Sequence, residues 1–145
     1  MKFDVVQLTR KMIEYPSESQ TSNVEITEQI EKWLTHLKFK IERIPYKDKN
    51  GVDKISIIAK LGTGKGGLSL MSHNDVVPAL PHQYKSRLDN GRIYGRGSCD
   101  MKGPLAATIC AASQFKASDL KKPLYIVVTA DEEIQAVGAK FVTDK

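Results

Sequence analysis

The sequence lacks any long apolar run. No stretch approaches the roughly 20 consecutive apolar residues that a membrane-spanning helix requires. Its start, MKFDVVQLTRKMIEYPS, alternates charged and apolar residues with the spacing of an amphipathic helix and has no unbroken apolar centre of a signal peptide. The sequence therefore predicts a protein with no membrane partner, and cytoplasmic residence is the default expectation.

Cysteine is scarce. The chain has two, Cys99 and Cys110, and they form no C-x-x-C pair. This excludes a zinc knuckle and a disulfide framework. We expect both residues to be small, reduced and buried, as free cysteines commonly are.

A block of like charge is also absent. The net charge is +5, which raises the question of a nucleic-acid partner. The lysines, however, are scattered along the whole chain, and no basic stripe with interleaved aromatic residues occurs. The pattern therefore indicates no nucleic-acid binding.

The composition is that of an ordinary globular protein. The 145 residues are 41% hydrophobic and 27% charged, which suits one compact domain with its own core. Apolar residues at helical spacing predict helices over 3–14 and 23–38, with Asn23 as the N-cap of the second. Two strands, 39–46 and 55–61, flank an Asn-Gly turn and predict a hairpin.

The second half of the chain predicts a βαβ unit. Strand 68–73 precedes a helix over 104–116 and a continuous apolar strand over 124–130, and the stretch 74–97 between them is expected to be irregular. The sequence GTGKGG (62–67) lacks the phosphate-loop pattern and leads into a strand, so it is interpreted as a turn. Together these elements predict an α/β fold.

Polar clusters occur near the ends of these elements. His73 and Asp75 follow strand 68–73, and residues two apart in an extended segment face the same way. An imidazole beside a carboxylate is the usual arrangement of a metal-binding histidine whose other ring nitrogen is held by an acid. A histidine hydrogen-bonded at a turn is the alternative for His73 taken alone.

The second cluster is IYGRGSCDMKG, in which glycines surround Asp100 just before the predicted helix. Glycines allow backbone angles that position a side chain tightly. A phosphate site at the helix start is an alternative interpretation, because glycines before a helix can bind anions. The spacing does not match G-x-G-x-x-G, and an aspartate would repel a phosphate, so a nucleotide-binding domain is the weaker interpretation.

The third cluster, Asp131-Glu132-Glu133, follows strand 124–130. Neighbouring side chains point in different directions along an extended chain, so the two glutamates cannot easily have the same chemical role. One can bind a metal ion while the other handles a water proton, which is what amide hydrolysis needs. A solvated acidic cap on the next helix is the alternative.

The segments SHNDVVP, YGRGSCDMKGPLAA and TADEEIQAVGA resemble, in order and spacing, the three signatures of the co-catalytic zinc peptidases and amidohydrolases. This family includes acetylornithine deacetylase, succinyl-diaminopimelate desuccinylase, aminoacylase, carnosinase and the glutamate carboxypeptidases. The resemblance implies a three-layer αβα sandwich with a mixed, mostly parallel sheet. Residues 1–145 would form only the N-terminal portion of the catalytic domain, incomplete at its C-terminal side and without the lid domain that mediates dimerisation in many relatives.

The same resemblance implies the site. His73 and Glu133 would bind different metal ions, and Asp100 would bridge both, with a cis peptide bond after it. Glu132 would be the general base and Asp75 the acid that orients His73, so these two are the predicted catalytic residues. Asp131 is left as a structural neighbour, expected to cap the next helix. The cofactors would be two divalent ions, zinc first, with cobalt or manganese as alternatives.

Two of the family's metal ligands are missing from the 145 residues, namely a carboxylate and a second histidine that lie further along the chain. His82 is not expected to replace them, because it belongs to a variable loop and suits a surface or substrate-side role. Each ion would keep two protein ligands, whereas catalytic zinc normally has about three. We therefore expect weak or partial metal occupancy and little hydrolysis by this chain alone.

The resemblance implies a small N-acyl amino acid or a short peptide as substrate. A second hypothesis is a non-catalytic binding or assembly module that retains the fold. Unpaired strand edges recruit partners, so a homo-oligomer is compatible with both hypotheses.

Overall fold

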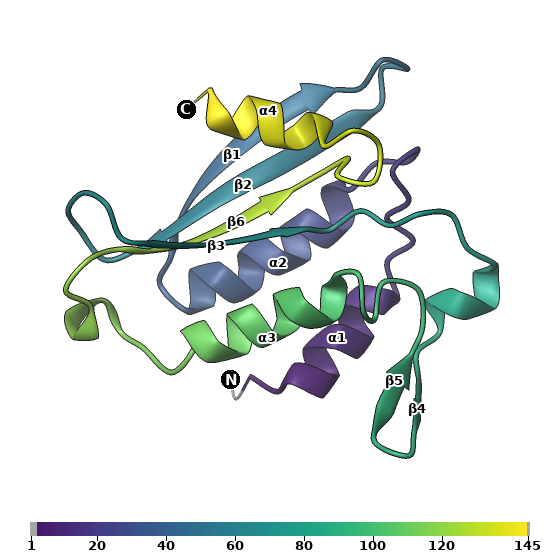
Figure 1. Ribbon diagram of the computed structural model, residues 1–145, viewed down its shortest axis with the longest axis horizontal. Helices are drawn as coiled ribbons and strands as arrows, with labels where there is room; N and C mark the ends of the chain where they lie inside the picture. Colours follow the sequence, from purple (N-terminus) through teal and green to yellow (C-terminus); the bar gives the residue numbers. More distant parts are fainter. Residues whose placement is uncertain (1–2, 145) are drawn as a thin grey trace.

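The computed structural model describes residues 3–144 as a sheet with helices on both of its faces (Figure 1). Its regular elements, in chain order, are helix α1 (Val5–Ile13), helix α2 (Val24–His36), strand β1 (Lys40–Lys47), strand β2 (Asp53–Leu61), strand β3 (Leu68–His73), the 3-10 turn η1 (Pro81–Tyr84), strand β4 (Arg87–Asp89), strand β5 (Arg92–Tyr94), helix α3 (Lys102–Ala112), the 3-10 turn η2 (Ala117–Asp119), strand β6 (Leu124–Thr129) and helix α4 (Val137–Thr143).

The main sheet has four strands in the order β1-β2-β6-β3. Strands β3 and β6 are parallel and are joined through α3, as the predicted βαβ unit requires. The sheet is mixed as predicted, although β1-β2 and β2-β6 are antiparallel and only one pair is parallel. Antiparallel pairs dominate because the β1-β2 hairpin supplies half of the strands and the described chain contains a single βαβ unit.

The helices form the two outer layers. Helices α1, α2 and α3 gather on one face of the sheet and α4 lies on the other (Figure 1). Strand β6 is largely apolar, as expected for a strand covered on both faces, and Ile126 and Val128 are fully buried. The core continues from β6 into Ile57 of β2 and into Ile30 and Ile109 of the helices. The α/β sandwich is therefore confirmed.

The clearest differences from the predictions lie at α3 and in the stretch 74–97. Helix α3 begins two residues earlier than expected, with Pro104 in its first turn, and ends at Ala112, where the hydrogen bonds change to the i→i−3 pattern. The stretch 74–97 is not wholly irregular, because β4 and β5 form a small hairpin around Asn90-Gly91. An Asn-Gly pair between alternating residues is a hairpin signal, so this element was predictable.

The cysteines depart from expectation in part. Cys110 lies partly buried in α3, but Cys99 is exposed because it sits in the loop that precedes the helix. The prediction of burial is therefore wrong for Cys99. Both thiols are free. In the part of the chain that the structure describes, no helix has the length and apolar character needed to span a bilayer.

Asn23 occupies the N-cap position of α2, but its side chain does not cap the helix. It is buried, and its Nδ2 donates to Ile55 O at 2.8 Å and to Asn74 Oδ1 at 2.9 Å. Its Oδ1 accepts from Ile55 N at 2.9 Å. One amide thus ties the start of α2 to β2 and to the segment that follows β3.

We expect Asn23→Ala to lower the free energy of unfolding by about 2–4 kcal/mol, because the Ile55 N–H and C=O would remain buried without partners. Urea denaturation followed by circular dichroism measures the change. The exposed Gln20→Ala, three residues earlier, should stay within about 0.5 kcal/mol of the unsubstituted protein. Equal shifts for both variants would contradict this role of Asn23.

Candidate metal centre

The ends of β3 and β6 bring two of the predicted clusters together. The strands are parallel and in register, so that His73 pairs with Thr129, two residues before Asp131. Because the carboxyl ends of parallel strands lie at the same edge of a sheet, the histidine and the acidic triplet meet there. Asp100 approaches the same edge from the loop before α3, with its Oδ1 3.1 Å from His73 Nε2.

Three side chains form a possible ligand group. The ligand group consists of His73, Asp100 and Glu133, each of which offers one ligand atom within 4.8 Å of the other two. Among residues 3–144 it is the one such group of three or more His, Cys, Asp or Glu side chains. The His73 side chain is 5% exposed, whereas that of Asp100 is 73% exposed. The group is thus anchored on its histidine side and open to solvent on its aspartate side.

The donor set fits a divalent cation. One imidazole and two carboxylates are ligands that zinc, cobalt and manganese accept. A fourth side chain, Glu132, lies beside them, with its Oε2 3.6 Å from His73 Nε2. So many carboxylates around one point repel one another and favour positive charge between them.

Asp75 is buried and holds the neighbouring segments in place. Its carboxylate accepts from the backbone N–H of Glu132 at 3.1 Å and of Glu133 at 3.2 Å, and from the hydroxyl of Ser19 at 2.7 Å. Its Oδ1 lies 3.4 Å from His73 Nδ1, which also lies 3.0 Å from the Asp75 carbonyl oxygen. With Nδ1 held in this way, Nε2 of His73 faces Asp100 and Glu132.

The charges at the site shift the pKa values of its residues. Burial lowers the pKa of His73, but the hydrogen bond and the charge of Asp75, together with Asp100, outweigh burial and raise the pKa to about 9. Burial raises the pKa of Glu133, and the charge of Asp100 raises it further. In the metal-free protein a protonated imidazole therefore supplies positive charge among the carboxylates.

Asp131, the first acid of the triplet, does not cap the following helix, and this expectation is wrong. Helix α4 begins only at Val137, and Asp131 turns inward with a φ of +56°. Its buried carboxylate accepts from Lys54 Nζ at 2.7 Å and from the hydroxyl of Tyr46 at 2.8 Å. Burial and this hydrogen bond raise the pKa of Tyr46. The alternative of a solvated acidic cap therefore fails for Asp131.

The loop before α3 has the close packing that its glycines suggested. A Cβ on Gly97, whose φ is +80°, would lie 2.8 Å from Val76 and 2.9 Å from the Lys102 side chain. The peptide bond between Asp100 and Met101 is cis, as the resemblance implied. His82 lies in η1, is exposed, and does not belong to the ligand group.

Sequence reasoning missed two residues that shape this region. They are Ser19, in the segment between α1 and α2, and Lys54 of β2. Both are buried in the structure. The one sequence signal was that Lys54 stands next to the apolar residues of β2. That signal does not show which residues the lysine contacts.

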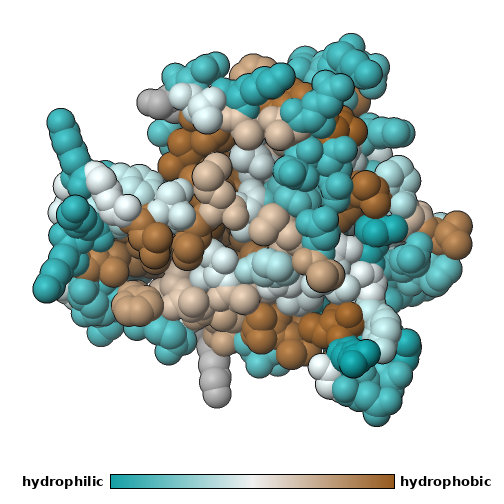
Figure 2. All heavy atoms as spheres, viewed as in Figure 1, coloured by the Kyte–Doolittle hydropathy of each residue, from teal (hydrophilic) through white to brown (hydrophobic). Residues whose placement is uncertain are grey.

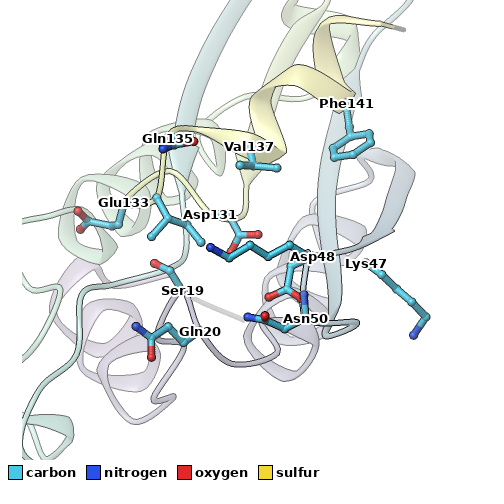
Figure 3. A pocket seen from close by; sticks show the side chains of 12 residues that line it. Ser19, Gln20, Lys47, Asp48, Asn50, Asp131, Glu133, Gln135, Val137 and Phe141 are labelled. Carbon is cyan, nitrogen blue, oxygen red and sulfur yellow. The ribbon is translucent and has the colours of Figure 1, made fainter.

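A pocket of about 780 Å³ lies beside the site (Figure 3). Ser19, Asp131 and Glu133 line one part of it, and Asn50 of the β1-β2 turn and Phe141 of α4 line another. The Phe141 ring is stacked on Tyr46, with the ring centroids 4.4 Å apart. Glu133 thus borders both the ligand group and this pocket.

The chain is similar to known hydrolases. It is 37% identical over 147 residues to acetylornithine deacetylase of Proteus mirabilis (strain HI4320), covering 94% of this chain and 38% of the relative. Among solved structures, human carnosine dipeptidase 1 matches 97% of this chain and 34% of its own, with a TM-score of 0.77 and 23% identity. The YXEP protein of Bacillus subtilis, a dinuclear metal-binding peptidase, gives a TM-score of 0.64 with 24% identity, covering 97% of this chain and 38% of that protein.

These likenesses concern a part of each relative, because the chain spans well under half of the length of the proteins that it matches. The two solved structures show the fold. The family is shown by the sequence instead. The sequence model of peptidase family M20/M25/M40 matches residues 69–145, a range that includes His73, Asp100, Glu132 and Glu133. As this match covers more than half of the chain, the protein belongs to peptidase family M20/M25/M40.

Proposed function

We propose that this chain is part of a metal-dependent hydrolase that cleaves an amide or peptide bond in a small N-acyl amino acid or a short peptide. The observation that carries the proposal is the convergence of His73, Asp100 and Glu133, whose ligand atoms lie within 4.8 Å of one another, beside Glu132. Membership of a peptidase family and the likeness to an acetylornithine deacetylase support it.

In this proposal the three side chains hold two divalent metal ions, zinc in the first place. His73 would hold one ion and Glu133 the other, and Asp100 would be a ligand shared by both. When bound, such ions polarise the scissile carbonyl group and lower the pKa of a water molecule. The solvent-open side of Asp100 leaves room for a substrate to approach.

Glu132 is the proposed general base. Its side chain is 49% exposed, so a water molecule can reach its carboxylate. It takes a proton from the attacking water as the new C–O bond forms, and delivers that proton to the leaving nitrogen as the C–N bond breaks. Glu133 points to the ligand group, so the two glutamates divide proton transfer and metal binding.

Asp75 is proposed to act through its neighbours. It keeps Nδ1 of His73 engaged, so that Nε2 is directed at the metal position. It also holds the backbone of both glutamates. We therefore assign it a positioning role, although the sequence alone placed it among the catalytic residues.

The chain alone is proposed to be nearly inactive. With His73 and Glu133 on different ions, each ion has two protein ligands, and catalytic zinc sites normally have about three. We propose that the 145 residues form the N-terminal portion of the catalytic domain, and that further ligands come from polypeptide outside it. The share of each relative that the chain covers supports this division.

One observation favours a second candidate, a binding or assembly module without catalysis. Strand β3 is at the edge of the sheet, and its Leu68 and Met71 are 60% and 56% exposed. Apolar side chains also reach the surface of the molecule in the view of Figure 2. An open strand edge can pair with another chain. Oligomers that form equally with and without zinc in size-exclusion chromatography, without hydrolysis, would favour this candidate.

Substitutions should separate the proposed roles. We expect Asp100→Ala to weaken Zn²⁺ binding at least tenfold, because a shared ligand is lost, whereas Glu132→Gln should leave the dissociation constant within about twofold. NMR titration with Zn²⁺ measures both constants. Any hydrolysis of N-acetylornithine or a dipeptide should fall by about 10²–10⁴-fold in Glu132→Gln. Equal loss of zinc binding in the two variants would refute the division between ligand and base.

Zinc binding should depend on pH through His73. Below its pKa of about 9 the imidazole is protonated, and the metal must displace that proton. We expect the apparent affinity to rise about tenfold for each pH unit between 6.5 and 8.5, and calorimetry at several pH values measures the slope.

Asp75→Asn provides the matched variant for this measurement. Removing the charge that raises the pKa of His73 should move the steep region to lower pH, so that the slope between pH 7.5 and 8.5 flattens. An unsubstituted protein whose affinity does not change over this range would contradict the assignment of His73 as a ligand.

A further inference from the structure

Lys54 is a buried cation that no step of the proposed reaction uses. It lies on β2, and its side chain is fully buried. Its Nζ donates to Asp131 Oδ1 at 2.7 Å, to Ser19 O at 2.7 Å and to Thr21 O at 2.8 Å. An ammonium group has three donors, so each of them has a partner.

These contacts connect Lys54 to Asp75 along two routes. On one route, the backbone oxygen of Ser19 accepts from Lys54 while the Ser19 hydroxyl donates to Asp75 at 2.7 Å. On the other, Asp131 accepts from Lys54, and the next two residues donate their backbone N–H groups to Asp75. The two routes close a ring of hydrogen bonds, which we call the Lys54–Asp75 ring.

The ring joins segments that are distant in the sequence. Residues 19–21 come from the loop before α2, Lys54 from β2, Asp75 from the end of β3, and residues 131–133 from the end of β6. Figure 3 shows Ser19 and Asp131 on the lining of one pocket. Asp75 is the member that touches His73. Glu133 belongs to the ligand group, and Glu132 Oε2 lies 3.6 Å from His73 Nε2.

We propose that Lys54 is a positioning residue that sets the backbone of Glu132 and Glu133 against Asp75. Two of its contacts hold the loop that presents Ser19, and the third holds the corner at Asp131 from which both glutamates extend. Lys54 thereby controls where the Glu133 carboxylate lies relative to His73. This inference rests on the metal centre of the proposed function.

A purely stabilising role would have a different signature. An ion pair between fully buried groups stabilises little overall, because desolvation offsets the attraction, but removal of one partner leaves a buried charge unpaired. Removing both partners should therefore restore much of the stability. It cannot restore the position of the glutamates, because the link between residues 19–21 and Asp131 would still be missing.

The test compares Lys54→Met with Lys60→Met, which removes a lysine from the other end of the same strand. In Lys54→Met we expect amide hydrogen exchange at Glu132 and Glu133 to accelerate at least tenfold, and the Zn²⁺ dissociation constant to rise about tenfold, the size typical of residues that orient ligands. Lys60→Met should leave both quantities within twofold, because the Lys60 ammonium donates to Gly64 O and lies over the Tyr125 ring, away from the Lys54–Asp75 ring.

The double variant Lys54→Met/Asp131→Asn separates the effect on the position of Glu132 and Glu133 from the effect on the stability of the fold. It also tests the proposal if Lys54→Met does not fold. We expect the double variant to fold with a urea midpoint close to that of the unsubstituted protein, while exchange at Glu132 and Glu133 stays fast and zinc binding stays weak. Recovery of all three quantities together would overturn the proposal, as would unchanged exchange in Lys54→Met.

Failure of the metal centre itself would be recognised separately. If added Zn²⁺ does not shift the NMR resonances of His73 in the unsubstituted protein, the proposed function fails. The exchange rates of Glu132 and Glu133 need no metal, and so they still decide whether Lys54 positions these residues.

Discussion

The buried carboxylate of Asp75 is the constraint on which the site depends. A carboxylate removed from water needs hydrogen-bond donors from the protein in place of water. For Asp75 they come from three separate segments: the Ser19 hydroxyl, the amides of Glu132 and Glu133, and the His73 ring. The segments must therefore meet at one point. Hydrogen bonds from His73 and Ser19 and from the two amides outweigh burial and lower the pKa of Asp75, which keeps it ionised.

Three consecutive acids are compatible with this fold because each one has a different environment. Asp131 turns inward at a left-handed backbone position and meets the ammonium of Lys54. Glu132 is half exposed, and Glu133 is partly buried next to His73 and Asp100. The separation limits the repulsion that three solvated neighbours would suffer, and it gives each carboxylate a distinct environment: one is paired with a buried ammonium, one is accessible to water, and one belongs to the candidate ligand group.

The fold and the chemistry are connected through the βαβ unit. Strands β3 and β6 are paired in register, so the segments that follow them lie side by side, and the helix between them begins directly after Asp100. Membership of the M20/M25/M40 peptidases, together with this geometry, makes amide or peptide hydrolysis the activity that the site supports best. Strand β3 lies at an open edge of the sheet, and the Asp100 side chain is exposed to solvent.

Apolar periodicity and short motifs are local properties, so the amino-acid sequence was enough to predict the order of the elements, the α/β class and the candidate residues His73, Asp100, Glu132 and Glu133. It placed the limits of α3 less well and missed the β4-β5 hairpin, although the Asn-Gly signal was present. The roles of Ser19, Lys54 and Asp131 and the side-chain contacts of Asn23 became apparent only from the fold. Each of them is buried against a partner more than 30 residues away, and such a partner is set by three-dimensional packing, on which local sequence carries no information.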